Sequence, residues 1–251
     1  MEKHLNVGDV LLSNNYGMFR VVEIKNCNNA TIEFLATKNL ESSRVADIKR
    51  GNVKDYYSES IFNVGVVGKK YKTRKDKKIL KEYVTWINML KRCYDEKLHD
   101  KNKTYMKCEV SDNFKHYENF YEWCNKQIGF NNSSWHLDKD LLIKGNKVYS
   151  EDTCVFLPQE INKALIKADK IRGDLPIGVY AHKKANKYMA QICNGNRNQR
   201  YLGLFDTELE AFNAYKTAKE AYLRELSERY KHQIDPRAYE ALMNYEVEID
   251  D

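Results

Sequence analysis

One segment, from Gly178 to Leu226, constrains the fold more than any other part of the chain, because its pattern changes once from strand to helix. Three short runs in it, residues 178–184, 187–194 and 200–205, have the composition of β-strands. Turn-forming residues separate the runs, and Asn194-Gly195 is among the strongest short signals for a hairpin. We therefore expect a twisted three-stranded sheet.

An amphipathic helix is predicted directly after the third strand. Thr207 suits a helix N-cap, and Glu210, three residues later, completes the sequence pattern of a capping box. Small and aromatic residues then recur at helical spacing, at Ala211, Ala214, Tyr215, Ala218, Ala221 and Tyr222. We expect the small-residue face of this helix to lie on the sheet.

These residues resemble the APETALA2-type DNA-binding domain of plant ethylene-response factors and of many phage and homing-endonuclease proteins. The resemblance is carried by residues 178–180, 188–192 and above all 201–207, which run into Glu210-Ala211 and Ala214-Tyr215. It implies a sheet that lies in the major groove of double-stranded DNA, with its exposed face on bases and phosphates. The chain has fewer Arg and Trp than the plant pattern, so we expect phosphate anchoring first. The predicted DNA contacts are Tyr180, His182, Lys184, Lys187, Gln191, Arg197, Arg200 and Tyr201.

Basic residues concentrate in two runs. Between Lys163 and Arg200 the chain has nine Lys or Arg and two acids, and between Lys69 and Lys81 it has eight and one, although the net charge of the whole chain is only +6. Such runs neutralise phosphates in nucleic-acid-binding proteins. The alternative is that each run is a solvated linker. Two runs beside a sheet typical of DNA readers favour phosphate binding.

Composition sets the outer bounds of the fold. A length of 251 residues and a hydrophobic share of 42% predict several small domains rather than a disordered chain. No window approaches the ~18 consecutive apolar residues of a membrane span, and the first ten residues lack the apolar core of a signal peptide. The expected location is cytoplasmic, in the host cell if a phage encodes the chain.

The part of the chain before Gly129 is predicted as a β domain followed by a helical region. Strand candidates at residues 10–13, 19–24, 30–37 and 43–48 predict a small, open N-terminal β barrel. This domain either docks on its neighbour or offers a surface to nucleic acid or to a protein partner. Between residues 83 and 128, apolar and aromatic residues at helical spacing predict helices that share an aromatic core.

Candidate chemistry lies between Trp135 and Asn162. Asp138-Lys139-Asp140 precedes a turn at Asn146, and residues 151–155 lead into a helix that carries Asn162. This spacing resembles the HNH nuclease motif, in which a hairpin packs on a helix, a His activates water and Asp, Asn or His side chains hold one divalent metal. Two positions depart from that family. Lys139 stands where the family has its His, and residues 152–154 read Asp-Thr-Cys where the family usually has Glu-Asn-Leu.

A lysine is a poor general base unless its pKa is strongly lowered, and neighbouring aspartates act in the opposite direction. His136 offers a base on the same strand face as Asp138 and Asp140. The alternative is that the aspartates only bond the backbone of the hairpin turn. The predicted catalytic residues are His136, Asp138, Lys139, Asp140 and Asn146, and the predicted ligands of a divalent metal, Mg²⁺ by its preference for oxygen, are Asp138, Asp140 and Asn162.

The two resemblances together cover residues 83–230 and look like phage homing or free-standing endonucleases. They predict an α+β multidomain protein that hydrolyses double-stranded DNA with a divalent metal and no small-molecule cofactor. Two alternatives are a non-catalytic DNA-binding regulator on a degenerate HNH scaffold, and a phage protein that acts on a host protein. The predicted divisions are a β-barrel-like domain at 1–68, a basic linker at 69–82, a helical and HNH-like ββα module at 83–170, an APETALA2-like domain at 171–232, and an acidic tail with a short helix at 233–251.

Overall fold

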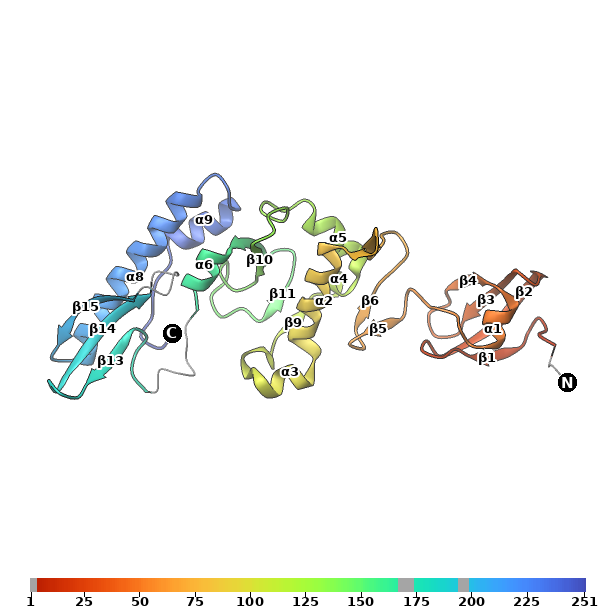
Figure 1. The fold of residues 1–251 in the computed structure, drawn as a ribbon, viewed down its shortest axis with the longest axis horizontal. Coiled ribbons are helices and arrows are strands. Elements are labelled where there is room, and N and C mark those ends of the chain that lie inside the picture. Colours follow the sequence, from red (N-terminus) through yellow and green to blue (C-terminus); the bar gives the residue numbers. More distant parts are fainter. Residues whose placement is uncertain (1–3, 167–173, 194–198) are drawn as a thin grey trace. The chain divides into compact units, whose positions relative to one another are not determined.

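The fold is that of a computed structural model, which describes residues 4–166, 174–193 and 199–251 (Figure 1). It has the mixed α+β composition that the sequence predicts. Backbone contacts divide the chain into two compact units, one ending at Trp123 and the other beginning at Cys124. The five divisions predicted from the sequence stay predictions. Among the described residues no helix is long and apolar enough to cross a membrane.

Unit 1 begins with an antiparallel sheet in the order β1-β2-β3-β4, formed by Val10–Leu12, Met18–Asn26, Asn29–Phe34 and Leu40–Ser43. The predicted open barrel is confirmed only as a four-stranded antiparallel sheet. This sheet is not a closed barrel, because β1 and β4 are its two edges and four strands are too few to close around a packed interior. The predicted strand at 43–48 is wrong. Its residues end β4 and form helix α1, Val45–Lys49, from which Ile48 reaches the core.

The helical part of unit 1 is built around aromatic side chains, as predicted. The indole of Trp86 donates a hydrogen bond to the carbonyl of Phe114 at 2.7 Å, and both residues are fully buried beside Tyr117 and Phe120. The elements are β5 Glu59–Ile61, β6 Gly65–Val66, α2 Lys81–Tyr94, α3 Glu96–Lys101, the 3₁₀ helix η1 Lys103–Tyr105, β9 Glu109–Val110, α4 Asp112–Lys115 and α5 Tyr117–Cys124.

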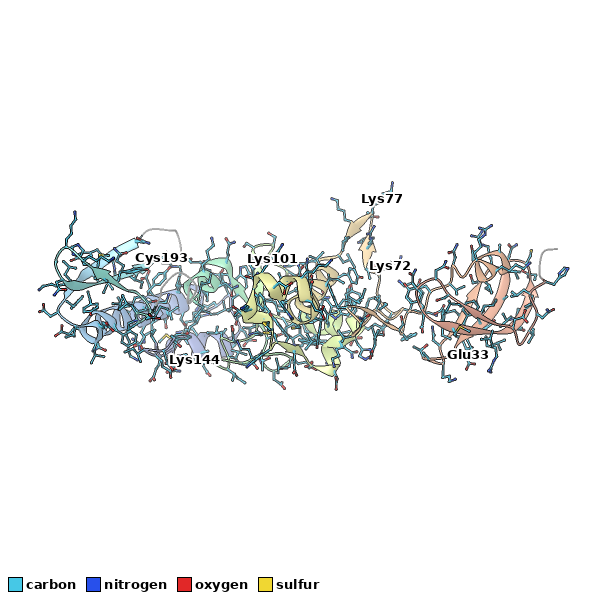
Figure 2. All side chains as sticks on the ribbon, turned by 90° about the horizontal axis from the view of Figure 1, so that it is seen from below. Glu33, Lys72, Lys77, Lys101, Lys144 and Cys193 are labelled. Atoms are coloured by element: carbon cyan, nitrogen blue, oxygen red, sulfur yellow. The ribbon has the colours of Figure 1, made fainter. Side chains whose placement is uncertain are left out.

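The segment at 69–82, predicted as a linker, contains a hairpin of β7 Arg74–Lys75 and β8 Lys78–Ile79. Its turn residues, Asp76 and Lys77, have φ of 49° and 63°. Two central residues in the left-handed region characterise the two-residue turn that joins tight hairpins. The sequence lacks the usual Asn-Gly or Asp-Gly at this turn, which is why its pattern indicates a linker. Figure 2 shows Lys77 at the tip and Lys72 nearer the base.

Unit 2 contains two strand-and-helix groups. The first pairs β10 Trp135–Asp138 with β12 Val155–Pro158, and helix α6, Gln159–Ala164, follows at once; β11 Val148–Tyr149 lies in the connection. This is the strand-strand-helix order predicted for the stretch. The second is the predicted three-stranded sheet, β13 Val179–His182, β14 Lys187–Cys193 and β15 Gln199–Phe205, followed by the long helix α8 Glu208–Tyr230.

Helix α8 begins at the predicted capping box. The hydroxyl of Thr207 accepts a hydrogen bond from the N–H of Glu210, and the carboxylate of Glu210 accepts one from the N–H of Thr207, both at 3.2 Å. These bonds satisfy two backbone donors that a helix start otherwise leaves without partners. A local sequence signal therefore sets where the longest helix starts.

Two hydrophobic cores of unit 2 share helix α8. Its first half packs on the three-stranded sheet through Ala211, Phe212 and Tyr215. Its second half packs on the hairpin, α6 and α9 through Leu223 and Leu226. The helix therefore connects the sheet to the hairpin, although the sequence places these groups in separate predicted divisions.

The acidic end of the chain folds back onto unit 2. Helix α9, Pro236–Met243, is the predicted short helix, and Val247 is buried in the core between the sheet and α8. Lys144, in the connection between β10 and β12, forms ion pairs of 2.8 Å with both Glu248 and Asp251. Part of the tail's acidic charge is thus neutralised by the same unit.

The close approach of Gly178 to Tyr215 of α8 lets the packing of the sheet on this helix be tested by substitution. It has φ of +77°, and a Cβ there would lie 2.0 Å from the ring of Tyr215; Gly145 also has φ of +77°, with nothing within 4 Å of such a Cβ. We expect Gly178→Ala to lower the free energy of unfolding by about 3 kcal/mol or more, through backbone strain plus a clash. Gly145→Ala should cost only the strain, about 1 to 2 kcal/mol. Denaturant unfolding measures both, and equal losses would contradict the packing argument.

Candidate functional site

The stretch predicted to carry chemistry is an antiparallel hairpin with a helix behind it. In its register His136 pairs with Leu157 and Asp138 with Val155. Val155, Leu157 and Ile161 are buried in the core shared with α8, so they hold this hairpin in place. His136 is exposed and Asp138 is half-buried at the end of β10, where the chain turns away.

The carboxylate of Asp138 caps that turn. Its Oδ1 accepts hydrogen bonds from the N–H groups of Asp140 at 3.1 Å and Leu141 at 2.9 Å. Burial, and then the nearby Asp140 carboxylate, raise the pKa of Asp138 to about 6. The residue therefore has a local structural role, as one of the sequence-based alternatives proposed.

Lys139 and Asn146 hold the connection between the strands. Lys139 is only 6% exposed, and its Nζ donates to the carbonyl of Asn146 at 2.8 Å and pairs with Oδ2 of Asp140 at 3.1 Å. In return, Nδ2 of Asn146 donates to the carbonyls of Lys139 at 2.6 Å and Val148 at 2.7 Å. An ammonium group that donates to these acceptors is not free to take a proton from water.

The predicted magnesium ligands are bonded to protein groups. Asp138 accepts two backbone hydrogen bonds, Asp140 pairs with Lys139, and Nδ2 of Asn162 donates to the carbonyl of Leu157 at 3.4 Å. A cation beside Asp140 opposes binding of a second one. The magnesium site at these residues stays a prediction.

The three-stranded sheet has one covered and one open face. Val179, Ala190 and Ile192 are buried against α8, so their neighbours along each strand lie on the opposite face. Between β14 and β15 a bulge interrupts the register at Ala190/Gln191, after which Gln191 pairs with Tyr201. The predicted contacts on the open face are Tyr180, His182, Lys187, Gln191 and Tyr201.

The other predicted DNA contacts lie elsewhere. Lys184 is exposed in the turn between β13 and β14. Arg197 lies outside the described residues. Arg200 pairs with the buried Ile192 across the strands, and it lines a cleft against α8 rather than the open face. Sequence reasoning also missed Met189 and Leu204, which pair with each other on the open face.

Two tyrosines dominate the open face. Tyr180 and Tyr201 are 44% and 56% exposed. Around them, Lys187 pairs with Asp206 at 2.9 Å and the amide of Gln191 donates to the sulfur of Met189 at 3.3 Å. The face therefore presents phenol groups and amides with modest charge.

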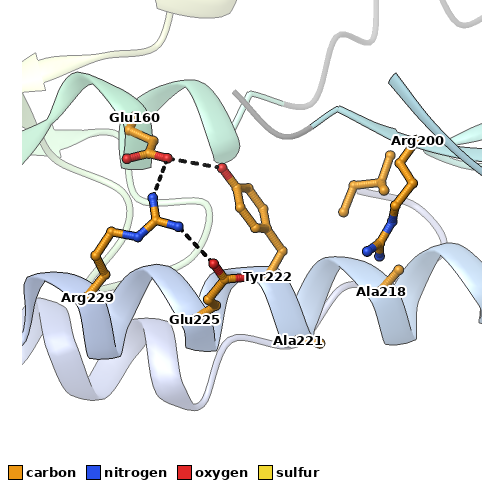
Figure 3. A pocket seen from close by; sticks show the side chains of 8 residues that line it. Glu160, Arg200, Ala218, Ala221, Tyr222, Glu225 and Arg229 are labelled. Carbon is orange, nitrogen blue, oxygen red and sulfur yellow. Dashed lines mark hydrogen bonds and ion pairs between the residues drawn. The ribbon is translucent and has the colours of Figure 1, made fainter. Parts of the chain in front are cut away.

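The cleft on the other side of the sheet has a volume of about 320 Å³ (Figure 3). Arg200 extends from β15 towards α8, while Glu160 of α6 pairs with Arg229 at 2.8 Å and Arg229 pairs with Glu225 at 2.7 Å. Burial, and then Glu160, raise the pKa of Tyr222 to about 12. This network joins α6 to α8. The sequence shows only the i,i+4 spacing of Glu225 and Arg229 within α8, because Glu160 is 69 positions from Arg229.

Comparisons of the chain with protein families, with curated proteins and with solved structures each found no match.

The raised pKa of Asp138 gives a pH-dependent prediction. The pKa of Asp138 in the folded protein, about 6, exceeds the ordinary 3.8, so folding favours the protonated carboxyl. The stabilisation that this gives is complete below pH 3.8 and is lost as the pH rises through 6. Asn keeps the oxygen that accepts both backbone hydrogen bonds and stays neutral. We therefore expect Asp138→Asn to be more stable than the wild type at pH 7.5, by on the order of 1 kcal/mol, and to lose this advantage by pH 4.

Urea unfolding across this pH range measures the effect, with Asp140→Asn as the contrasting variant. That change removes the carboxylate partner of the buried Lys139 ammonium, so it should destabilise the protein at neutral pH. An Asp138→Asn variant that is less stable than the wild type at pH 7.5 would show that its charge is favourable in the fold.

Proposed function

We propose that this protein binds double-stranded DNA through the open face of the sheet β13-β14-β15. The observation that carries the proposal is the pair of exposed tyrosines on one face of a sheet whose other face is fixed to α8. A β-ribbon fits the major groove, where tyrosine and amide side chains reach phosphates and base edges. Lys184 at the hairpin turn and the net charge of +6 add attraction for the backbone.

The proposed role is binding without cleavage, as in the regulator considered above. Lys139 occupies the position of the usual base and donates to the connection, while Asp140 and Asn146 are bonded to the same segment. Each of these groups already has a structural partner, which weighs against a proton-transfer role. The proposed protein partner of the N-terminal sheet stays a separate prediction.

Metal-dependent hydrolysis by an HNH-type site is the second candidate. It is supported by the strand-strand-helix order of β10, β12 and α6 and by the exposed His136, which shares a strand face with Asp138. In this candidate, His136 rather than Lys139 is the general base. Action on a host protein remains the third alternative.

The two faces of β15 make the binding proposal testable. We expect the double change Tyr180→Ala and Tyr201→Ala to weaken binding of a 30-base-pair duplex roughly tenfold, the loss of about two hydrogen bonds. Arg200→Gln, next to Tyr201 but on the covered face, should keep most of the affinity. Fluorescence anisotropy measures each dissociation constant. A larger loss in Arg200→Gln than in the double variant would place the DNA contact on the wrong face for this proposal.

A nicking assay separates binding from hydrolysis. We expect the wild type to retard supercoiled plasmid on a gel and to leave it uncut with Mg²⁺ or Mn²⁺, because Lys139 replaces the usual histidine base and pairs with Asp140. Samples with chelator serve as the control. Metal-dependent nicking that disappears in Asp138→Asn and in His136→Ala, while retardation persists, would instead establish the second candidate.

A further inference from the structure

The basic hairpin β7-β8 of unit 1 is held in place by helix α5. One oxygen of Glu118 accepts hydrogen bonds from the N–H groups of Lys69 and Lys70 at 2.7 and 2.6 Å. The ring of Tyr71 stacks on Tyr121, with centroids 4.0 Å apart. These contacts fix the chain just before the hairpin, so its charges occupy a defined surface rather than a free linker.

The hairpin carries positive charge at a cost to its own stability. Lys75 lies directly opposite Lys78, and like charges in that position destabilise a strand pair. Lys77 has φ of 63° in a turn position that favours glycine. Within the described parts of the chain, no acidic side chain forms an ion pair with Arg74 or with these lysines. An external anion would relieve this repulsion.

A cleft of about 540 Å³ opens at the base of the hairpin. Every charged side chain that lines it is basic, and Nζ of Lys54 lies 4.3 Å from the centre of the Tyr56 ring. Lys69 is neutralised by Glu41, which leaves three cations. They are Lys54, Lys72 and Arg74, and they share the lining with the tyrosines Tyr56 and Tyr71.

We propose that the hairpin β7-β8 and this cleft form a second DNA-binding surface. The hairpin lysines contact phosphates of a duplex, and the cleft holds the backbone of one strand between Lys54, Lys72 and Arg74. Phosphates supply the missing counter-charge, and basic side chains are common donors to them. The hydroxyl of Tyr71 already donates to Glu122 at 3.0 Å, so this ring shapes the cleft and the cations bind the phosphates. The inference rests on the proposed DNA-binding function, but it uses residues of the other unit.

Neutralising the hairpin tests the proposal in the full chain. The triple variant Lys75→Gln, Lys77→Gln and Lys78→Gln is compared with a control that loses the same charge from exposed sites of the same unit, Lys97→Gln, Lys103→Gln and Lys107→Gln. We expect the hairpin variant to bind a 30-base-pair duplex at least about tenfold more weakly at 0.15 M salt. Its slope of log K against log salt should fall by about two to three, near 0.9 per lost phosphate contact. The control should stay within twofold of the wild type.

The outcomes separate this proposal from the sheet proposal. If the hairpin and control variants both bind DNA as tightly as the wild type, while the tyrosine double variant loses affinity, the second surface is refuted and the sheet proposal stands. If only the hairpin variant loses affinity, the second surface stands and the sheet proposal fails. A wild-type protein that binds no DNA refutes both. Circular dichroism and melting of each variant ensure that a loss reflects contacts rather than unfolding.

Discussion

Burial along helix α8 is the interaction on which unit 2 depends. The hairpin β10-β12 is only marginally stable alone, and the three-stranded sheet needs a cover for its apolar face. Helix α8 packs on both. Each buried leucine, such as Leu223 or Leu226, contributes about 2 kcal/mol. Between the two cores, the buried ammonium of Lys219 donates to the carbonyl of Ala164 at the end of α6, and burial lowers the pKa of Lys219 to about 8. The helix thus makes the sheet a rigid platform, which the proposed DNA-binding face requires.

Local signals explain why much of this arrangement could be predicted. The capping box at Thr207 and the small-residue spacing after it depend only on neighbouring residues, and the structure has both. The open face could not be predicted in full, because strand alternation fails at a bulge. Leu204 lies on the open face, so regular alternation along β15 would put Arg200 on the open face and Tyr201 on the covered face. The bulge reverses this assignment, and only the register shows it.

The hairpin at residues 135–158 shows the same limit for chemistry. The resemblance to the HNH motif implied its strand-strand-helix order, and the structure has this order. It did not predict the partners of Lys139, which is buried by residues of the connection and bonded to Asn146, seven positions away. A pattern of residue types gives the places where a base and metal ligands would stand. Whether those side chains are available depends on how the connection folds back, which is a tertiary property.

Charge and shape have different parts in the proposed binding. The open face of the sheet is weakly charged, and Lys187 on it is already paired, so its tyrosines supply oriented contacts rather than long-range attraction. The hairpin lysines have no such partners in the described chain, and their attraction for phosphates falls as salt rises. Two of the acids at the C-terminal end do not oppose this attraction strongly, because Lys144 pairs with Glu248 and Asp251. We therefore expect the hairpin lysines to attract DNA and the tyrosines of the sheet to orient it.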